Sequence, residues 1–374
     1  MEAWHKMDMK ETSKYRKIFE ELQKGIRDGL YPIGVPIPSE ESLVRKFKVS
    51  RITAVKAMDE LVRCGLVYRK RGSGTFATPT ARRESGRLGL IMPSLSFGEI
   101  FPPICQSLMR CAQADGYTLL LGDISAATPK ERARQACAVA RSFVEQHVAG
   151  VILQPLAFLR KPERATQEIL ALFESAQIPV VLIDRDIEIK ADGIRHDFVG
   201  IDNVAAGRAL GAHILAAGTK RIHFLMRPNC ATVIRDRLIG VQSALAEKSL
   251  PVKVIDADPS NASALRLWFK KRSHPDAVIC ESDQVAALLN NTLRRFGLSV
   301  PKDVMLAGFD DVHYATTMAP PLTTVHQPCA DIAKIAYRTL RERISNADLP
   351  SRRILLPAPL VVRESTSQWP PRKS

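Results

Sequence analysis

The feature that most constrains the fold is an alternation of short apolar runs with amphipathic stretches between residues 88 and 308. Eight runs have the length and composition of buried strands, at 88–92, 118–121, 150–153, 180–183, 198–201, 222–226, 277–280 and 304–308. Short buried strands that alternate with helices predict parallel sheets with helices on both faces. The order breaks at residues 186–197, so we expect an α/β body of two lobes with a cleft between them.

Polar residues follow most of these runs. Ligands of open α/β sheets bind beyond the carboxyl ends of the strands. The positions to consider are therefore Asp123, Asp184, Arg185, Asp202, Arg227, Glu281, Ser282, Asp283, Asp310 and Asp311. Such a lining suits a polyhydroxylated or otherwise polar small molecule. For Asp202 and Asp283 we favour the alternative that the side chain caps the helix that follows.

A different pattern occupies the first 78 residues. Apolar residues at helical spacing predict a helix over residues 15–26, and glycines and prolines then interrupt it. Ser39 and Ser50 are placed to cap a second and a third helix. The segment 66–77 alternates like two strands joined by a glycine turn. Three helices and a hairpin predict a winged helix-turn-helix domain over residues 10–78, followed by a polar linker at 79–86.

The charge of the chain is concentrated in this first part. Residues 10–87 carry 18 Lys and Arg against 9 Asp and Glu, a net of +9 out of +15 for the whole chain. A concentrated basic domain indicates a polyanionic partner, nucleic acid or an anionic membrane surface, and a solvated basic surface is the alternative. No run approaches the roughly 18 apolar residues of a spanning helix. The N-terminal residues are charged throughout and the seven cysteines are scattered, so we expect a cytoplasmic protein with reduced thiols.

The third helix is the element expected to enter a major groove, because its first turn carries residues 50–53 and Lys56. The tip of the wing carries Arg69, Lys70 and Arg71, which suit the flanking phosphates or the minor groove. Gly72 and Gly74 allow the backbone of the wing to approach DNA closely.

Several motifs here are shared with one family. They are a G-x-x-P-x-G lead, P-S-E at 38–40, V-S-R-x-T at 49–53, A-x-x-x-L at 57–61 and G-x-G-T-F at 72–76. With them the segment resembles the DNA-binding domain of the GntR family of bacterial regulators. Sequence and resemblance together mark as DNA-binding Ser39, Ser50, Arg51, Thr53, Lys56, Arg71, Gly72, Ser73, Gly74 and Thr75. The family usually has Arg where Glu41 and Val55 stand, so we expect a different operator sequence.

Five longer stretches of the body, at 199–225, 235–245, 275–312, 320–336 and 357–366, resemble the effector-binding domain of the LacI/GalR family. That domain is itself like periplasmic sugar-binding proteins, and the similarity spans nearly all of residues 87–366. The resemblance implies a hinge, a homodimer and effector contacts at Phe97, Phe101, Asp184, Arg185, Arg237, Ser282 and Asp310. The alternative for Arg237 and Asp310 is that they pair with each other and hold the lobes together.

No phosphate-binding loop, metal-ligand spacing or nucleophile motif is present in the sequence. We therefore expect no cofactor, no metal and no enzymatic activity. The two modules together predict a sequence-specific repressor of transcription, whose partners are double-stranded operator DNA and a sugar-like effector bound between the lobes. The layout resembles arabinose-type repressors. The alternatives are a cytoplasmic sugar-binding protein and a sugar-acting enzyme with an accessory nucleic-acid-binding head.

Overall fold

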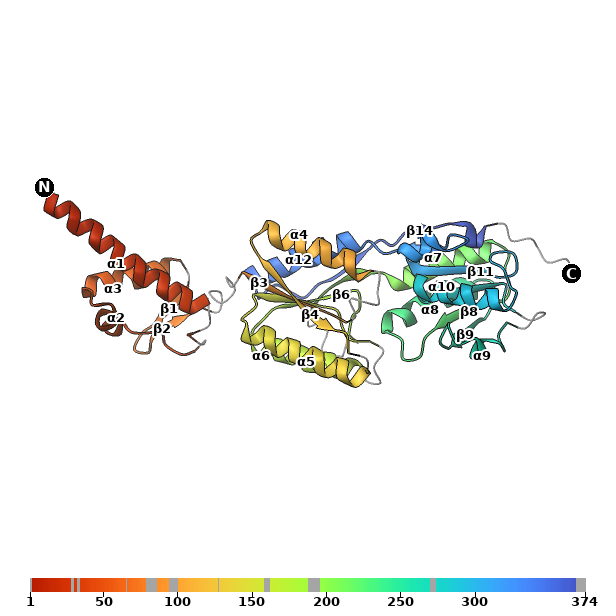
Figure 1. The fold of residues 1–374 in the computed structure, drawn as a ribbon, viewed down its shortest axis with the longest axis horizontal. Coiled ribbons are helices and arrows are strands. Elements are labelled where there is room, and N and C mark those ends of the chain that lie inside the picture. The colour runs from red at the N-terminus through yellow and green to blue at the C-terminus, as the bar shows by residue number, and fades with distance from the viewer. Residues whose placement is uncertain are drawn as a thin grey trace.

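The computed structural model describes residues 2–27, 30–31, 34–64, 66–78, 86–93, 100–126, 128–157, 162–187, 196–269 and 274–367. A small N-terminal head is followed by two α/β lobes (Figure 1). The predicted fold class, a winged helix-turn-helix before a two-lobed body with parallel sheets, is confirmed. Within the described ranges no helix has the length and apolar character needed to cross a bilayer.

The head contains three helices and a β-hairpin: α1 (Glu2–Arg27), α2 (Glu40–Phe47), α3 (Arg51–Arg63), β1 (Val67–Lys70) and β2 (Gly74–Ala77). The hairpin is antiparallel, and Lys70 pairs with Gly74 across its turn. Ile18 and Leu22 of α1 pack with Met58 and Leu61 of α3 in a core of its own. The head therefore has the apolar centre that an independently folded domain needs.

The first lobe is built on a parallel sheet in the order β13-β7-β6-β5-β3-β4. Its strands are β3 (Arg87–Pro93), β4 (Thr118–Ile124), β5 (Gly150–Leu153), β6 (Val180–Ile183), β7 (Asp197–Ile201) and β13 (Arg353–Leu356). Figure 1 shows that helices cover both faces of this sheet. They are α4 (Phe101–Ala114) and α12 (Cys329–Ser345) on one face, and α5 (Pro129–Glu145) and α6 (Pro162–Ser175) on the other.

The second lobe has a sheet in the order β14-β12-β11-β10-β8-β9, parallel except for β14. Its strands are β8 (Ile222–Met226), β9 (Val252–Asp256), β10 (Ala277–Cys280), β11 (Met305–Asp310), β12 (Thr323–His326) and β14 (Leu360–Val361). One face packs against α7 (Asn203–Ala216) and α8 (Thr232–Ala246). The other packs against α9 (Ala262–Leu265), α10 (Asp283–Arg295) and α11 (His313–Thr317), and a 3-10 helix follows at Glu364–Thr366.

The predicted boundary between the lobes is wrong. β7 pairs with β6 in the first sheet, so the chain leaves the first lobe after residue 201 and not within 186–197. It returns at residues 326–329, between β12 and α12, and crosses again at 356–360, between β13 and β14. The chain therefore crosses between the lobes three times, as a hinge of several segments requires.

Candidate functional site

The first turn of α3 presents two of its side chains to solvent. Ser50 caps the helix, because its Oγ accepts from the Thr53 backbone N at 3.2 Å and lies 2.7 Å from Thr53 Oγ1. Thr53 is only 4% exposed, which leaves its side chain little surface for the predicted contact with DNA. Arg51 and Ile52 are exposed. Ser39 caps α2 in the same way, because its Oγ accepts from the Ser42 backbone N at 3.3 Å.

Two cations near the predicted DNA face make contacts within the head. Lys56 Nζ lies 4.9 Å from the centre of the Tyr15 ring on α1, although the Lys56 side chain is exposed. Arg69 of β1 forms ion pairs with Glu40 at 3.2 Å and with Asp59 at 2.9 Å. Arg69 thus ties the hairpin to the first turn of α2 and to α3, and does not point freely from the wing.

The tip of the wing is open to solvent. Arg71, Gly72 and Ser73 form its turn and are exposed. Gly72 has φ of 75° and Gly74 has φ of 119°, a region of backbone conformation that favours glycine. Thr75 follows in β2 and is half-buried. The backbone therefore turns sharply at this tip with only short side chains beside the arginine, as close approach to a phosphate backbone requires.

A chain of hydrogen bonds runs from the first lobe to the second. Gln154 Nε2 and Gln327 Nε2 donate to the two carboxylate oxygens of Asp184, at 2.6 and 2.8 Å. Arg237 Nη2 donates to Gln327 Oε1 at 3.5 Å and to Asp310 Oδ1 at 3.1 Å. Gln154 and Asp184 follow β5 and β6 of the first lobe, and Gln327 lies on the crossing at 326–329. Arg237 of α8 and Asp310 at the end of β11 belong to the second lobe. This polar chain therefore bridges the lobes.

Arg237 donates four hydrogen bonds, two of them within this polar chain, and is 5% exposed. Its Nε donates to Asn203 Oδ1 at 2.9 Å and its Nη1 to the Glu281 carbonyl oxygen at 2.7 Å. Its guanidinium lies over the Phe309 ring at 4.6 Å. Arg237 and Asp310 form an ion pair, as the alternative interpretation of the sequence stated, but both belong to the second lobe, so their pair does not itself hold the lobes together.

Asp310 is under strain and has an altered acidity. Burial raises its pKa to about 6, although the neighbouring Arg237 acts in the opposite direction. Its φ is 109°, and Asp184 and Asp311 also have positive φ, at 63° and 54°. Such conformations cost an ordinary residue about 1–3 kcal/mol and cluster at functional sites. The three carboxyl residues with this conformation lie at or directly after the ends of β6 and β11.

Arg185 lies next to Asp184, with Nε 3.5 Å from the Asp184 carboxylate and a side chain that is 15% exposed. Burial lowers its pKa, and so do the charges of Arg237 and Arg227. Arg227 itself pairs with Glu281 at 2.5 Å. Three guanidinium groups thus lie among the carboxylates of this region, which makes it able to bind hydroxyl or anionic groups of a ligand.

The positions of Ser282 and Asp283 reverse one prediction. Ser282 is the N-cap of α10 and accepts from Val285 N at 3.4 Å, so the prediction that Asp283 caps this helix is wrong. The Asp283 carboxylate is buried, accepts from Thr324 Oγ1 at 2.6 Å and from Val312 N at 3.1 Å, and burial raises its pKa well above the usual value. Asp283 therefore fixes the loop after β11. Asp202 caps α7 as predicted.

A cavity of about 570 Å³ opens beside the polar chain. It is lined by Pro102, Pro103, Asp310, Asp311, Val312, His313, His326, Gln327, Pro328, Cys329, Ala330 and Asp331. Phe101 is 5% exposed and belongs to the core of the first lobe, and the two prolines after it line this cavity in place of its ring. Phe97 lies outside the described residues, and so does the Asp123 side chain.

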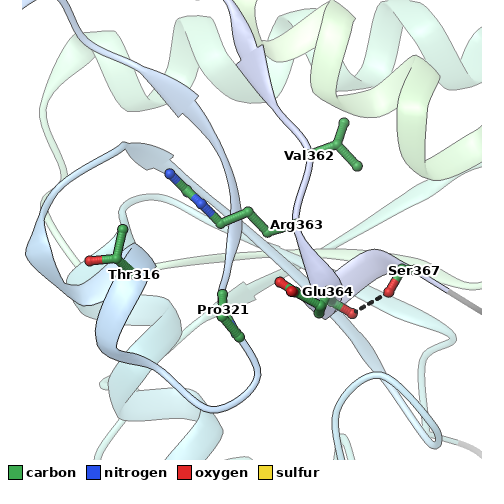
Figure 2. Close-up of a pocket in the computed structure, with 6 residues that line it drawn as sticks. All are labelled: Thr316, Pro321, Val362, Arg363, Glu364 and Ser367. Carbon is green, nitrogen blue, oxygen red and sulfur yellow. Dashed lines mark hydrogen bonds between the residues drawn. The ribbon is translucent and has the colours of Figure 1, made fainter.

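A second hollow, of about 540 Å³, lies on the second lobe near the end of the described chain (Figure 2). It is lined by Thr316, Pro321, Val362, Arg363, Glu364 and Ser367. Arg363 donates to Asp311 at 2.6 Å and to a backbone carbonyl at 2.9 Å. Its guanidinium therefore holds the loop after β11 to the segment before β12. Among the described residues no three His, Cys, Asp or Glu side chains gather as a metal site.

Sequence reasoning missed the amides of the site. Gln154 follows β5, and Gln327 follows β12, a strand that was not predicted. Asn203, which accepts from Arg237, is the first residue of α7. The rule that ligand-facing residues follow strand ends would have found Gln154, had amides been considered after the predicted strands. It could not have found Gln327, because the strand before it was not predicted.

Comparison with known proteins supports both halves of this description. Residues 14–77 match the family described as bacterial regulatory proteins, gntR family, and residues 212–366 match a periplasmic binding protein-like domain. The arabinose metabolism transcriptional repressor of Geobacillus stearothermophilus is 26% identical over 377 residues, covering 97% of this chain and all of that protein. An HTH-type transcriptional regulator of Streptomyces limosus is 30% identical over 307 residues, 79% of this chain and 82% of that one.

Among solved structures, the transcriptional regulator CelR in complex with cellobiose has a TM-score of 0.64. It is 23% identical and covers 85% of this chain and 91% of its own. At this identity the likeness concerns the fold. Both resemblances inferred from the sequence are confirmed.

Proposed function

Because the chain belongs to the HTH-type transcriptional regulators of bacteria, with a gntR-family head on a periplasmic-binding-protein-like body, we propose that it is a repressor controlled by a sugar-type effector. The head binds operator DNA, and the effector binds between the lobes and changes the affinity of the head for that DNA. The observation that carries this proposal is the hydrogen-bonded chain from Gln154 to Asp310, since it joins both lobes at a cavity.

The chemistry of the site favours a polyhydroxylated ligand. The cavity of about 570 Å³ falls within the usual range of small-molecule sites, about 300–1,000 Å³. Carboxylates accept from sugar hydroxyls and a guanidinium donates to two oxygens at once. A relative that spans nearly the whole chain is named for arabinose metabolism. The contacts that we propose are Asp184, Arg185, Arg237, Ser282 and Asp310. Of these, Asp310 lines the cavity, and Asp184 and Arg237 are bonded to Gln327, which also lines it.

The control of DNA binding follows from the same bonds. A ligand that replaces the Gln327 contacts with Asp184 and Arg237 changes how the lobes sit about the three crossings. Couplings between two sites of one protein are typically about 1–3 kcal/mol. We propose that the movement reaches the head through the linker at 79–86.

The DNA-binding unit that we propose comprises residues 10–78, and the effector body residues 87–366. Two copies related by a two-fold axis would present two α3 helices to successive major grooves, about 34 Å apart. Double-stranded operator DNA is the macromolecular partner, contacted by the capped first turn of α3 and by the open wing tip.

A thermal-shift screen of the full-length protein against sugars, sugar acids and sugar alcohols tests the effector half of the proposal. A ligand that binds the native state raises the free energy of unfolding, by about 2.7 kcal/mol at one hundred times its Kd, and the unfolding temperature rises with it. Arg237→Met and Asp310→Asn should each abolish the shift, and Arg208→Ala, which removes an exposed partner of Glu247, should keep it. A shift that survives both cleft variants would place the sugar elsewhere.

A further inference from the structure

The most exposed large apolar side chain of the described residues lies on the helix expected to read DNA. Ile52 is 80% exposed, and it is the second residue of α3. An isolated exposed isoleucine on a protein surface needs no explanation. This one stands in the first turn of the recognition helix, where a side chain reaches base edges.

The neighbours of Ile52 are committed to other contacts. Ser50 and Thr53 are bonded to each other at the helix start. Lys56, one turn along, lies against the Tyr15 ring. Further along the same helix Asp59 is paired with Arg69. In the first turn this leaves Arg51 and Ile52 as the two side chains that project from the head.

The electrostatic setting of this turn selects an anionic partner. The first turn of α3 contains no acidic residue, whereas the first turn of α2 holds Glu40 and Glu41. The positive end of the helix dipole and the Arg51 charge therefore face the same way as Ile52. A second copy of this basic head would be repelled from this face, whereas a duplex would be attracted to it.

We propose that Ile52 is a specificity-determining residue that packs on the 5-methyl group of a thymine in each half-site of the operator. The inference rests on the proposed DNA-binding function. The major-groove edge of thymine is the one that carries a methyl group, and apolar side chains recognise it by contact. An isoleucine cannot donate or accept a hydrogen bond, so contact with a methyl group is the base readout open to it.

The experiment starts from a duplex that the full-length protein selects from a pool of random-sequence DNA. Each thymine of that duplex is then replaced in turn by deoxyuridine, which lacks only the 5-methyl group. We expect one position in each half-site where the replacement weakens binding about fourfold, the value for one buried methyl-sized group. The other thymines should tolerate the replacement. Because only the DNA changes, folding of the protein does not enter the result.

Variants of Ile52, measured on the same duplexes, test whether this side chain is the one that contacts the methyl group. Ile52→Ala should bind the thymine and the deoxyuridine duplexes equally, and Ile52→Val should keep most of the discrimination. Val62→Ala, which shortens another exposed branched residue at the far end of α3, should discriminate like the wild type. Unchanged unfolding temperatures would show that the variants are folded.

The outcomes separate the two proposals. Failure to select any sequence would overturn the DNA-binding function and this inference with it. Selective binding with no deoxyuridine-sensitive position, or with equal sensitivity in Ile52→Ala and wild type, would overturn the inference alone. A change in oligomeric state in Ile52→Ala without loss of thymine discrimination would assign the residue to a protein contact and would also overturn it.

Discussion

Two helices of the second lobe touch through their backbones, and this contact sets the position of Arg237. A Cβ built on Gly240 of α8 would lie 2.0 Å from the Val204 carbonyl oxygen and 2.7 Å from the Arg208 nitrogen of α7. A Cβ on Gly207 would lie 2.1 Å from the Arg237 carbonyl oxygen. Because the opposing atoms are backbone, no side chain can rotate to make room. Gly240→Ala must therefore push the helices apart.

The magnitude follows from two opposed effects. Alanine in place of glycine inside an open helix stabilises it by about 1 kcal/mol. Over-packing a close-packed contact costs about 1–3 kcal/mol, and a clash with backbone belongs at the upper end. We expect a net loss of about 2 kcal/mol. The displaced α8 should also lengthen the bond from Arg237 to Asn203, which is 2.9 Å here.

Urea unfolding followed by tryptophan fluorescence measures this loss of stability in the second lobe. Trp268 packs edge-on against His223 in the second lobe, and replacing Trp4 and Trp369 by Phe leaves it as the reporter among the three tryptophans of the chain. Gln242→Ala, which places the same residue at an exposed position of α8, is the control and should stay within about 0.5 kcal/mol. An unchanged or higher midpoint for Gly240→Ala would refute the close-packing argument.

Three further predictions concern the head and the two lobes. Arg51→Ala should weaken binding to the selected duplex by about 1–3 kcal/mol in a gel shift, and Arg294→Ala, an exposed change in the second lobe, should not. The pKa of Asp310 is raised to about 6, so its contribution to stability is present below pH 4 and is lost as the pH rises through 6. Relative to Asp310→Asn, the wild type should therefore lose about 2 kcal/mol in urea unfolding between pH 4 and 7. Asp197 has a fully buried carboxylate between two arginines, so Asp197→Ala should cost about 3–5 kcal/mol in thermal denaturation, against about 0–1 for Asp331→Ala in an exposed pair.

Most interior strands were predictable from the sequence; of the four edge strands β4 was predicted, whereas β9, β13 and β14 were not. β5, β6 and β10 are buried on both faces and appear as unbroken apolar runs. β9 and β13 lie at the edges of their sheets, and exposed residues interrupt their burial pattern. A strand exposed on one side does not form an apolar run, so a search for such runs passes over it.

β12 was missed for a different reason. Its Thr323 and Thr324 are fully buried. The Thr323 hydroxyl bonds the Arg363 carbonyl and the Thr366 hydroxyl, and the Thr324 hydroxyl donates to Asp283, partners that lie about 40 residues away along the chain. Polar residues become core residues only when the tertiary structure supplies their partners. Gln327 follows this strand, which is why the bridge between the lobes stayed hidden.

The motif of the head identified its residues but did not predict which of their side chains face solvent. Thr53 falls within V-S-R-x-T, yet it points into the head core, and Ile52, at the variable position of the same motif, points out. Arg69 carries the charge expected of a wing, but the acidic residues of α2 and α3 hold it. Spacing along one helix cannot tell which side chains another element has already bound.

The central claim is that the interlobe site and the head are coupled, and one titration tests it directly. Fluorescence anisotropy would follow the full-length protein on a labelled copy of its selected duplex, with and without a saturating amount of the sugar found in the thermal-shift screen. A coupling of about 1–3 kcal/mol predicts a change in the DNA dissociation constant of about 5- to 150-fold, and none in Arg237→Met. Equal DNA affinity with the sugar bound and absent would contradict the account.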